Sequence, residues 1–154
     1  MTKYVTLAIL ALGLFAARAL ANPTPVFAGY ATLDGRQTVP PTDSPGSAGA
    51  SVMGWFNESV TITVSCDGLE DCITDVTIWR GQPGANGEFL FSVFPNGFIC
   101  GQSTESDAFD ATNVGYLNAG ELYVQIHTQA HPDGELRGQL IPSRDDPDRS
   151  AAPR

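Results

Sequence analysis

Lysine and histidine are nearly absent from this sequence, and their scarcity excludes several kinds of chemistry. The only lysine, Lys3, lies near the start of the chain, and the only histidines are His127 and His131. Beyond residue 3 there is no lysine to form a Schiff base, to act as a general base or to form an isopeptide crosslink. A metal centre could draw on two imidazole ligands at most.

Positive charge is also scarce. From residue 22 onward, six arginines stand against 17 acidic residues, which gives this part of the chain a net charge of −11. Nucleic acids and anionic membranes attract proteins with excess positive charge, so we expect neither as a partner. The sequence also lacks the long 3.5- or 3.6-residue periodicity of a coiled coil.

The one long apolar run is too short to cross a membrane and is typical of a secretory signal. It covers residues 5–17, about 13 residues against the ~20 that a spanning helix needs. Lys3 precedes the run, and Ala19-Leu20-Ala21 follows as a small-x-small cleavage site. We expect a signal peptide over residues 1–21, a domain over 22–142 and a disordered polar tail over 143–154. The mature protein would be secreted, to an extracellular or periplasmic location.

Three cysteines remain in the exported part: Cys66, Cys72 and Cys100. Cys66 and Cys72 flank a turn-rich segment, and an oxidising compartment favours a disulfide between them. Pairing of Cys100 with either cysteine stays open, because connectivity cannot be deduced from sequence. No Cys-x-x-Cys occurs, which argues against a zinc site built on cysteine.

Alternation of β-branched and polar residues predicts an all-β fold without a helix. The pattern is clearest in SVTITVS, residues 59–65, and ITDVTIW, residues 73–79. Residues 96–110 look irregular and acidic. The predicted strands cover residues 27–33, 48–56, 59–65, 73–79, 88–94, 122–127 and 135–141. Short strands spaced by turns indicate a Greek-key sandwich or barrel. Alternation places these residues inside it: Phe27, Ile62, Val64, Ile78, Phe89, Phe91, Val124, Ile126 and Leu140.

Two segments resemble the CHRD domains, which are named for the developmental antagonist chordin. Residues 31–41 read ATLDGRQTVPP and are similar to the opening motif of that family. Residues 119–128 read AGELYVQIHT and residues 131–140 read HPDGELRGQL, which fill nearly every position of the closing motif. The loop GANG at residues 84–87 also fits. The resemblance spans about residues 27–142.

The resemblance implies an immunoglobulin-like Greek-key β-sandwich or barrel, similar in outline to copper/zinc superoxide dismutase. It also implies an extracellular or envelope protein, while the activity of the family is poorly defined. Many members carry a His-x-His before the Gly-x-Asn-Gly loop, and with two later histidines this would form a copper or zinc set. Here the matching stretch is Thr77-Ile78-Trp79, so only His127 and His131 remain as metal ligands.

These observations favour a binding or structural module of the cell envelope or extracellular space, with no catalysis and no cofactor. The alternative is a copper- or zinc-binding protein related in form to superoxide dismutase, with His127 and His131 as ligands. We expect Glu135 and Arg137 to join a structural network rather than to bind substrate. The partner would be an extracellular protein or glycan, and Asn57 begins a glycosylation sequon. The candidate binding surface comprises Trp79, Arg80, Asn86, His127, His131, Asp133, Glu135 and Arg137.

Overall fold

The computed structural model describes residues 25–55, 59–69, 71–94 and 100–143. The strands are β1 (Phe27–Asp34), β2 (Ser47–Gly54), β3 (Val60–Asp67), β4 (Ile73–Arg80), β5 (Glu88–Ser92), β6 (Gln102–Glu105), β7 (Leu122–Thr128), β8 (Leu136–Gln139) and β9 (Ile141–Pro142). A short 3₁₀ helix, η1 (Gly35–Gln37), follows β1, and an α-helix, α1 (Ala111–Asn118), precedes β7. No helix in these ranges has the length and hydropathy to cross a membrane.

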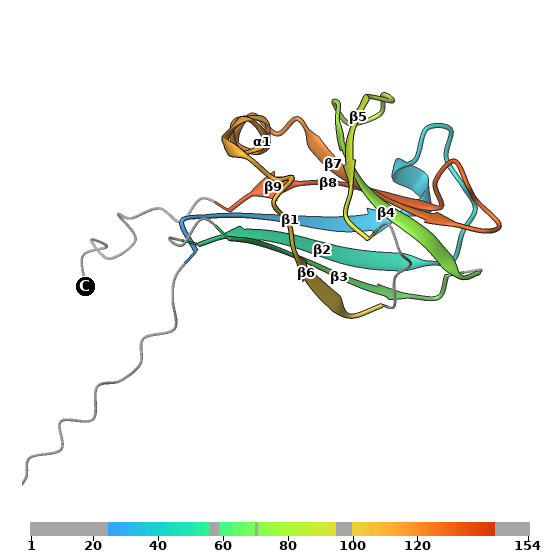
Figure 1. Cartoon of the computed structure of the whole chain (residues 1–154). Helices are drawn as coiled ribbons and strands as arrows, with labels where there is room; N and C mark the ends of the chain where they lie inside the picture. The colour runs from blue at the N-terminus through green and yellow to red at the C-terminus, as the bar shows by residue number, and fades with distance from the viewer. Residues whose placement is uncertain (1–24, 56–58, 70, 95–99, 144–154) are drawn as a thin grey trace, which may run out of the picture.

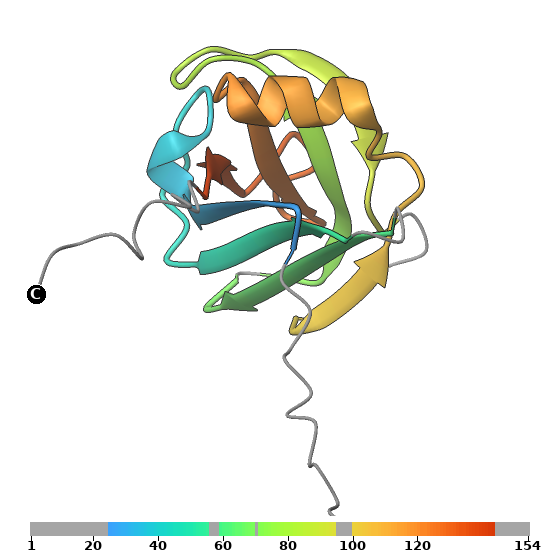
Figure 2. The ribbon, with the colours of Figure 1, turned by 90° about the vertical axis from the view of Figure 1, so that its left-hand side faces the viewer.

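The strands form one curled antiparallel sheet (Figure 1). Its order is β5-β4-β7-β8-β1-β2-β3-β6, with β9 paired to β1. Viewed from the end, the strands surround the core as a half-barrel and α1 crosses one side of it (Figure 2). The prediction of an all-β fold is therefore confirmed, whereas the immunoglobulin-like and superoxide dismutase-like outline stays a prediction.

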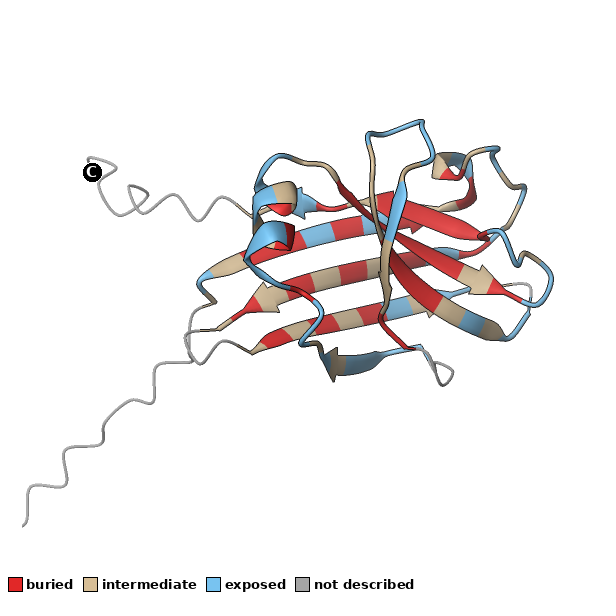
Figure 3. Ribbon diagram, turned by 45° about the horizontal axis from the view of Figure 1, so that its top comes forward, coloured by how far each residue is buried: buried red, intermediate tan, exposed pale blue. Residues whose placement is uncertain are grey.

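Alternating side chains on the strands build the core, as the banding in Figure 3 shows. Most of the predicted inward residues are buried: Ile62, Val64, Ile78, Val124, Ile126 and Leu140 are each 0% exposed. Phe27 and Phe91 are partly buried against the core. Phe89 is 51% exposed, so its prediction was wrong. The cause is a shift in the β4–β5 register, which sets Phe89 opposite the outward residue Trp79.

β8 meets β1 at a seam where only a glycine fits. A Cβ on Gly138 would lie 2.5 Å from the backbone oxygen of Thr32 and 2.9 Å from Leu33 Cγ. The two strands therefore approach so closely at this position that a side chain would not fit.

The helix α1 and the strand β6 were missed by the sequence analysis, which predicted no helix and an irregular segment over residues 96–110. Asp110 caps α1 by accepting a hydrogen bond from the backbone N–H of Asn113 at 3.0 Å. Leu117 is fully buried, and its Cδ1 would lie 2.6 Å from a Cβ on Gly29 in β1. The short helix is therefore held by its cap and by one buried leucine.

The predicted Cys66–Cys72 disulfide was wrong, because Cys66 is bonded to Cys100 and Cys72 is a free, exposed thiol. β3 and β6 pair in antiparallel register, with Val64 opposite Gln102. Continuing that register by two residues sets Cys66 opposite Cys100, at a Cα–Cα distance of 5.2 Å. The disulfide therefore links β3 and β6 covalently just beyond the last residue pair of their ladder.

The predicted signal peptide over residues 1–21 and the sequon asparagine, Asn57, lie outside the described residues, as do residues 144–154 of the predicted tail. Ser143, assigned to that tail, donates its backbone N–H to the carbonyl of Ala28 at 2.8 Å.

Candidate functional site

Three loops lie side by side on one face of the half-barrel, and we call residues 35–42, 81–87 and 129–135 the loop face. Asn86 Nδ2 donates to the carbonyl of Val39 at 3.0 Å, which links the second loop to the first. Thr42 Oγ1 donates to the carbonyl of Glu135 at 2.8 Å, which links the first loop to the third. The loops therefore support one another across large sequence separations.

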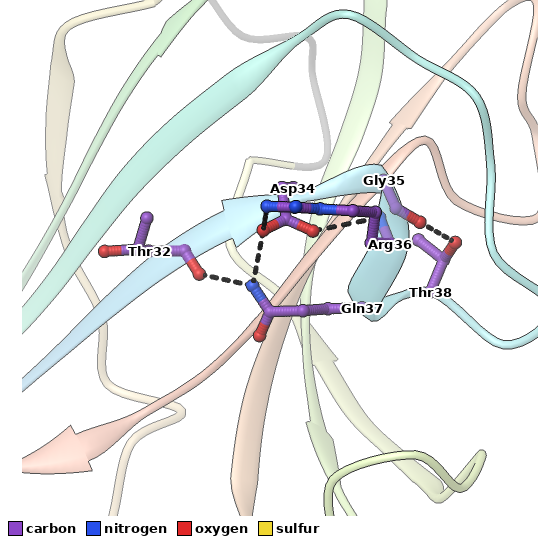
Figure 4. Close-up of polar contacts among 6 residues, drawn as sticks. All are labelled: Thr32, Asp34, Gly35, Arg36, Gln37 and Thr38. Atoms are coloured by element: carbon purple, nitrogen blue, oxygen red, sulfur yellow. Dashed lines mark hydrogen bonds and ion pairs between the residues drawn. The ribbon is translucent and has the colours of Figure 1, made fainter.

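The first loop is shaped by the opening motif (Figure 4). The carboxylate of Asp34 accepts hydrogen bonds from the backbone N–H of Arg36 at 2.9 Å and from its guanidinium at 3.2 Å. Gln37 Nε2 donates to the carbonyl of Thr32 at 2.9 Å. Burial raises the pKa of Asp34, but the hydrogen bonds from Arg36 and Gln37 outweigh it and hold the pKa below its ordinary value. The turn thus presents Arg36 and Gln37 in a defined position.

Glu135 anchors the third loop from inside the protein. Its side chain is 0% exposed. The carboxylate accepts hydrogen bonds from Ser44 Oγ at 2.5 Å and from Thr128 Oγ1 at 2.7 Å. Thr128 Oγ1 in turn accepts the backbone N–H of His131 at 3.1 Å. These bonds join the third loop to Thr128 at the end of β7 and to Ser44, which follows the first loop.

Arg137 is almost completely buried, at 2% exposure, and lies over an aromatic ring. Its guanidinium carbon is 3.6 Å from the ring centroid of Tyr123, and Nη2 donates to the carbonyl of Gln82 at 2.9 Å. Burial lowers the pKa of Arg137, and interaction with Tyr123 only partly opposes that effect. Tyr123 also stacks on Trp79, with 6.1 Å between centroids. The guanidinium of Arg137 and the rings of Tyr123 and Trp79 therefore form a row on the outer side of the sheet.

His127 has hydrogen-bond partners within the chain at both ring nitrogens. Nδ1 lies 2.9 Å from the carbonyl oxygen of Pro132, which can only accept, so Nδ1 carries the proton. Nε2 lies 2.8 Å from Thr77 Oγ1, which also accepts the indole N–H of Trp79 at 2.7 Å. Thr77 and Trp79 hold the positions where the resemblance described above would place a His-x-His pair. Here those positions form a hydrogen-bonded chain that ends on His127.

The donor set therefore does not fit a copper or zinc ion. A metal would have to displace Thr77 or the Pro132 carbonyl from His127. In the part of the chain that the structure describes, no three His, Cys, Asp or Glu side chains gather as metal ligands would. The backbone N–H and carbonyl of His131 both shape the turn, through Thr128 and Gly134.

A pocket of about 390 Å³ opens between the first two loops. Its lining residues are Arg36, Gln37, Thr38, Val39, Pro41, Pro83, Gly84, Arg137 and Gln139. Of the residues predicted for the binding surface, only Arg137 lines it. Arg36, Gln37 and Gln139 were missed, although all three belong to the two quoted motifs. Their side chains converge only because β1 and β8 are neighbours in the sheet.

The remaining predicted residues are spread around this pocket. His131 and Asp133 line a neighbouring hollow of about 230 Å³, against Val39 and Pro41. Arg80 forms an ion pair with Glu121 at 2.9 Å and lies 4.2 Å from the ring centroid of Tyr116. Hydrogen bonding to Glu121 raises the pKa of Arg80. Arg80 lies at the edge of the loop face, where it lines a hollow of about 300 Å³ together with Gly81 and Gln82.

The CHRD domain family model matches residues 30–140. The match runs from β1 to the end of β8 and includes all three loops of the loop face. Neither the curated proteins nor the solved structures contain a significant match to the chain. The family model covers most of the sequence, so this chain belongs to the CHRD domain family.

Proposed function

We propose that the chain is an exported binding module whose loop face holds an extracellular protein or glycan, without catalysis and without a cofactor. The observation that carries this proposal is the pocket between the first two loops. A hydrogen bond joins these two loops, and both extend from one continuous sheet. Binding residues on loops need a rigid scaffold to keep their positions, and the half-barrel provides one. The pocket is concave and mixes apolar walls with a few polar groups, as ligand sites do.

The hydrogen bonds of two ionisable groups at or beside the loop face, Glu135 and His127, support binding rather than catalysis. Glu135 is buried and accepts bonds from Ser44 and Thr128. His127 has both ring nitrogens in contact with protein oxygen atoms. A general base or nucleophile must reach a reacting group from within a pocket, whereas these side chains stabilise turns.

Export is the second part of the proposal. The disulfide between Cys66 and Cys100 is consistent with folding in an oxidising compartment. The apolar run at residues 5–17 supplies the corresponding leader. An extracellular partner is the one that such a protein would meet.

Immobilised protein tests the binding role. Wild-type chain, the double variant Pro41→Trp/Pro83→Trp and the control Pro45→Trp are incubated with extracellular material from the native host. Pro41 and Pro83 are exposed and line the pocket, whereas Pro45 is exposed and lies outside it. We expect wild type and Pro45→Trp to retain the same components and the double variant to lose them. Equal retention by all three proteins would contradict a role for the loop face.

A further inference from the structure

The two buried polar side-chain atoms without a hydrogen-bond partner among the described residues belong to neighbouring side chains of one pocket. They are Arg137 Nη1, a donor, and Gln139 Oε1, an acceptor. Both residues lie on β8 and are two positions apart, so their side chains leave the same face of the sheet. Both also line the 390 Å³ pocket. Buried polar atoms are almost always paired, so two such atoms at a pocket are available to hydrogen-bond a group bound there.

The charge of Arg137 is also uncompensated. No carboxylate of the described residues forms an ion pair with it: Asp34 pairs with Arg36 and Glu121 pairs with Arg80. The buried carboxylate of Glu135 accepts hydrogen bonds from Ser44 and Thr128. The contacts of Arg137 are the ring of Tyr123 and the carbonyl of Gln82. A buried guanidinium is normally paired with an anion, and the planar group is suited to bind a carboxylate through two hydrogen bonds.

On Gln139 the atom without a hydrogen-bond partner is an acceptor, whereas on Arg137 it is a donor. The Nε2 atom of Gln139 already donates to the carbonyls of Gly81 at 3.0 Å and Gly120 at 2.8 Å. Those two bonds fix the orientation of the amide, so Oε1 is left to accept a bond from a ligand donor such as a hydroxyl. The ligand must therefore present a donor a few bonds away from its anionic group.

The rest of the pocket fits a small ring. Val39, Pro41 and Pro83 give it apolar walls, against which the C–H face of a saturated ring would pack. Arg36 lies at the rim with an 88% exposed side chain, and Gln37 beside it adds another amide. A carboxylate, adjacent hydroxyls and a C–H face occur together in the uronic acid residues of acidic polysaccharides.

From this arrangement we propose that the pocket binds a uronic acid residue of an extracellular polysaccharide, with its carboxylate on Arg137 and a ring hydroxyl on Gln139. This inference rests on the proposed binding function and names the ligand class for that face. It also explains how a chain with a net charge of −9 can take an anionic ligand. The contact is made by one buried guanidinium rather than by a positive surface.

Three matched probes test the chemistry: trigalacturonate, its methyl ester, which keeps the hydroxyls but loses the charge, and triglutamate, which has carboxylates but no hydroxyls. Titration calorimetry gives the affinities, and the NMR signal of the Arg137 side-chain N–H reports contact. We expect trigalacturonate to bind at least ten-fold more tightly than either of the other probes and to shift the Arg137 signal.

Pro83→Trp fills the pocket from an exposed loop position, and Pro45→Trp is its control. The first should abolish trigalacturonate binding and the second should leave it unchanged. Equal binding of the methyl ester or of triglutamate, or full binding by Pro83→Trp, overturns the inference, as does the absence of trigalacturonate binding to wild type. If wild type fails to bind trigalacturonate but still retains extracellular material that the double variant loses, the proposed function stands and only the uronate assignment falls.

Discussion

The side chains around His127 form one chain of hydrogen bonds that links two strands to a loop. Thr77 Oγ1 lies between the indole N–H of Trp79 and Nε2 of His127, at 2.7 and 2.8 Å. On the other side of the ring, Nδ1 donates to the carbonyl of Pro132. The chain of bonds joins β4 to β7 and to the turn that follows it, so it holds the third loop of the loop face in place.

Thr77→Val tests this role, because valine keeps the β-branched shape but removes the hydroxyl. The Trp79 N–H and His127 Nε2 both lose their partner, so we expect the free energy of unfolding to fall by about 1–3 kcal/mol. Urea unfolding measures the change. Thr74→Val, at an exposed position of the same strand, is the control and should stay within about 0.5 kcal/mol of wild type.

Thermal unfolding of wild type with and without excess zinc or copper tests whether this part of the protein binds a metal. A ligand that binds the native state raises stability, and so raises Tm. We expect the Tm of wild type to stay unchanged with either ion. A rise that disappears in His127→Ala would restore the metal-binding alternative.

Among the elements, the β3–β6 pair depends on a covalent link. The Cys66–Cys100 disulfide closes a segment of the chain with a sequence separation of 34, and β6 lies at the outer end of the sheet order. Loop-closure entropy predicts that the link stabilises the fold by about 3–4 kcal/mol. We expect Cys66→Ser/Cys100→Ser to lose about that much in urea unfolding and Cys72→Ser, at an exposed free thiol, to lose almost nothing. A large loss in Cys72→Ser instead would contradict the observed pairing.

An element can be predicted from sequence when the interactions that stabilise it come from residues within that element. The strand β3 was predicted from Ser59 to Ser65 and lies at Val60–Asp67, because alternating β-branched residues carry their own signal. The helix α1 has the sequence ATNVGYLN, whose Thr, Asn and Gly residues are poor helix formers. It forms because Asp110 caps it and Leu117 packs on Gly29, and only the second of these depends on the tertiary structure.

The disulfide and the pocket were beyond prediction for the same reason. Cys72 is six residues from Cys66, but the β3–β6 register and not sequence distance selects the partner. The pocket likewise combines Gln37, Pro83 and Gln139, which lie far apart in the chain. The two family motifs contain Gln37 and Gln139 but not Pro83. Only the sheet order shows that the two motifs lie next to each other.

At the scale of the whole molecule, the number of amino groups depends on whether the predicted leader has been removed, because the chain has so little lysine. Lys3 is the only lysine of the chain. If the leader is removed near Ala21, the exported protein starts near Asn22, and its α-amino group is the one amine left. An unprocessed chain would carry two, on Met1 and Lys3.

Labelling of the secreted protein with an amine-reactive ester therefore reads out processing directly. We expect intact-mass analysis to show a single added label and a mass lower than that of the full chain by residues 1–21. Protein retained inside the cell, still carrying its leader, should take up to two labels and serves as the control. Two labels on secreted material would mean that Lys3 remains attached. Because the exported part then has six arginines and no lysine, any permanently charged cationic side chain that contacts an acidic ligand must be an arginine. In the described domain, the arginine that lacks a carboxylate partner is Arg137.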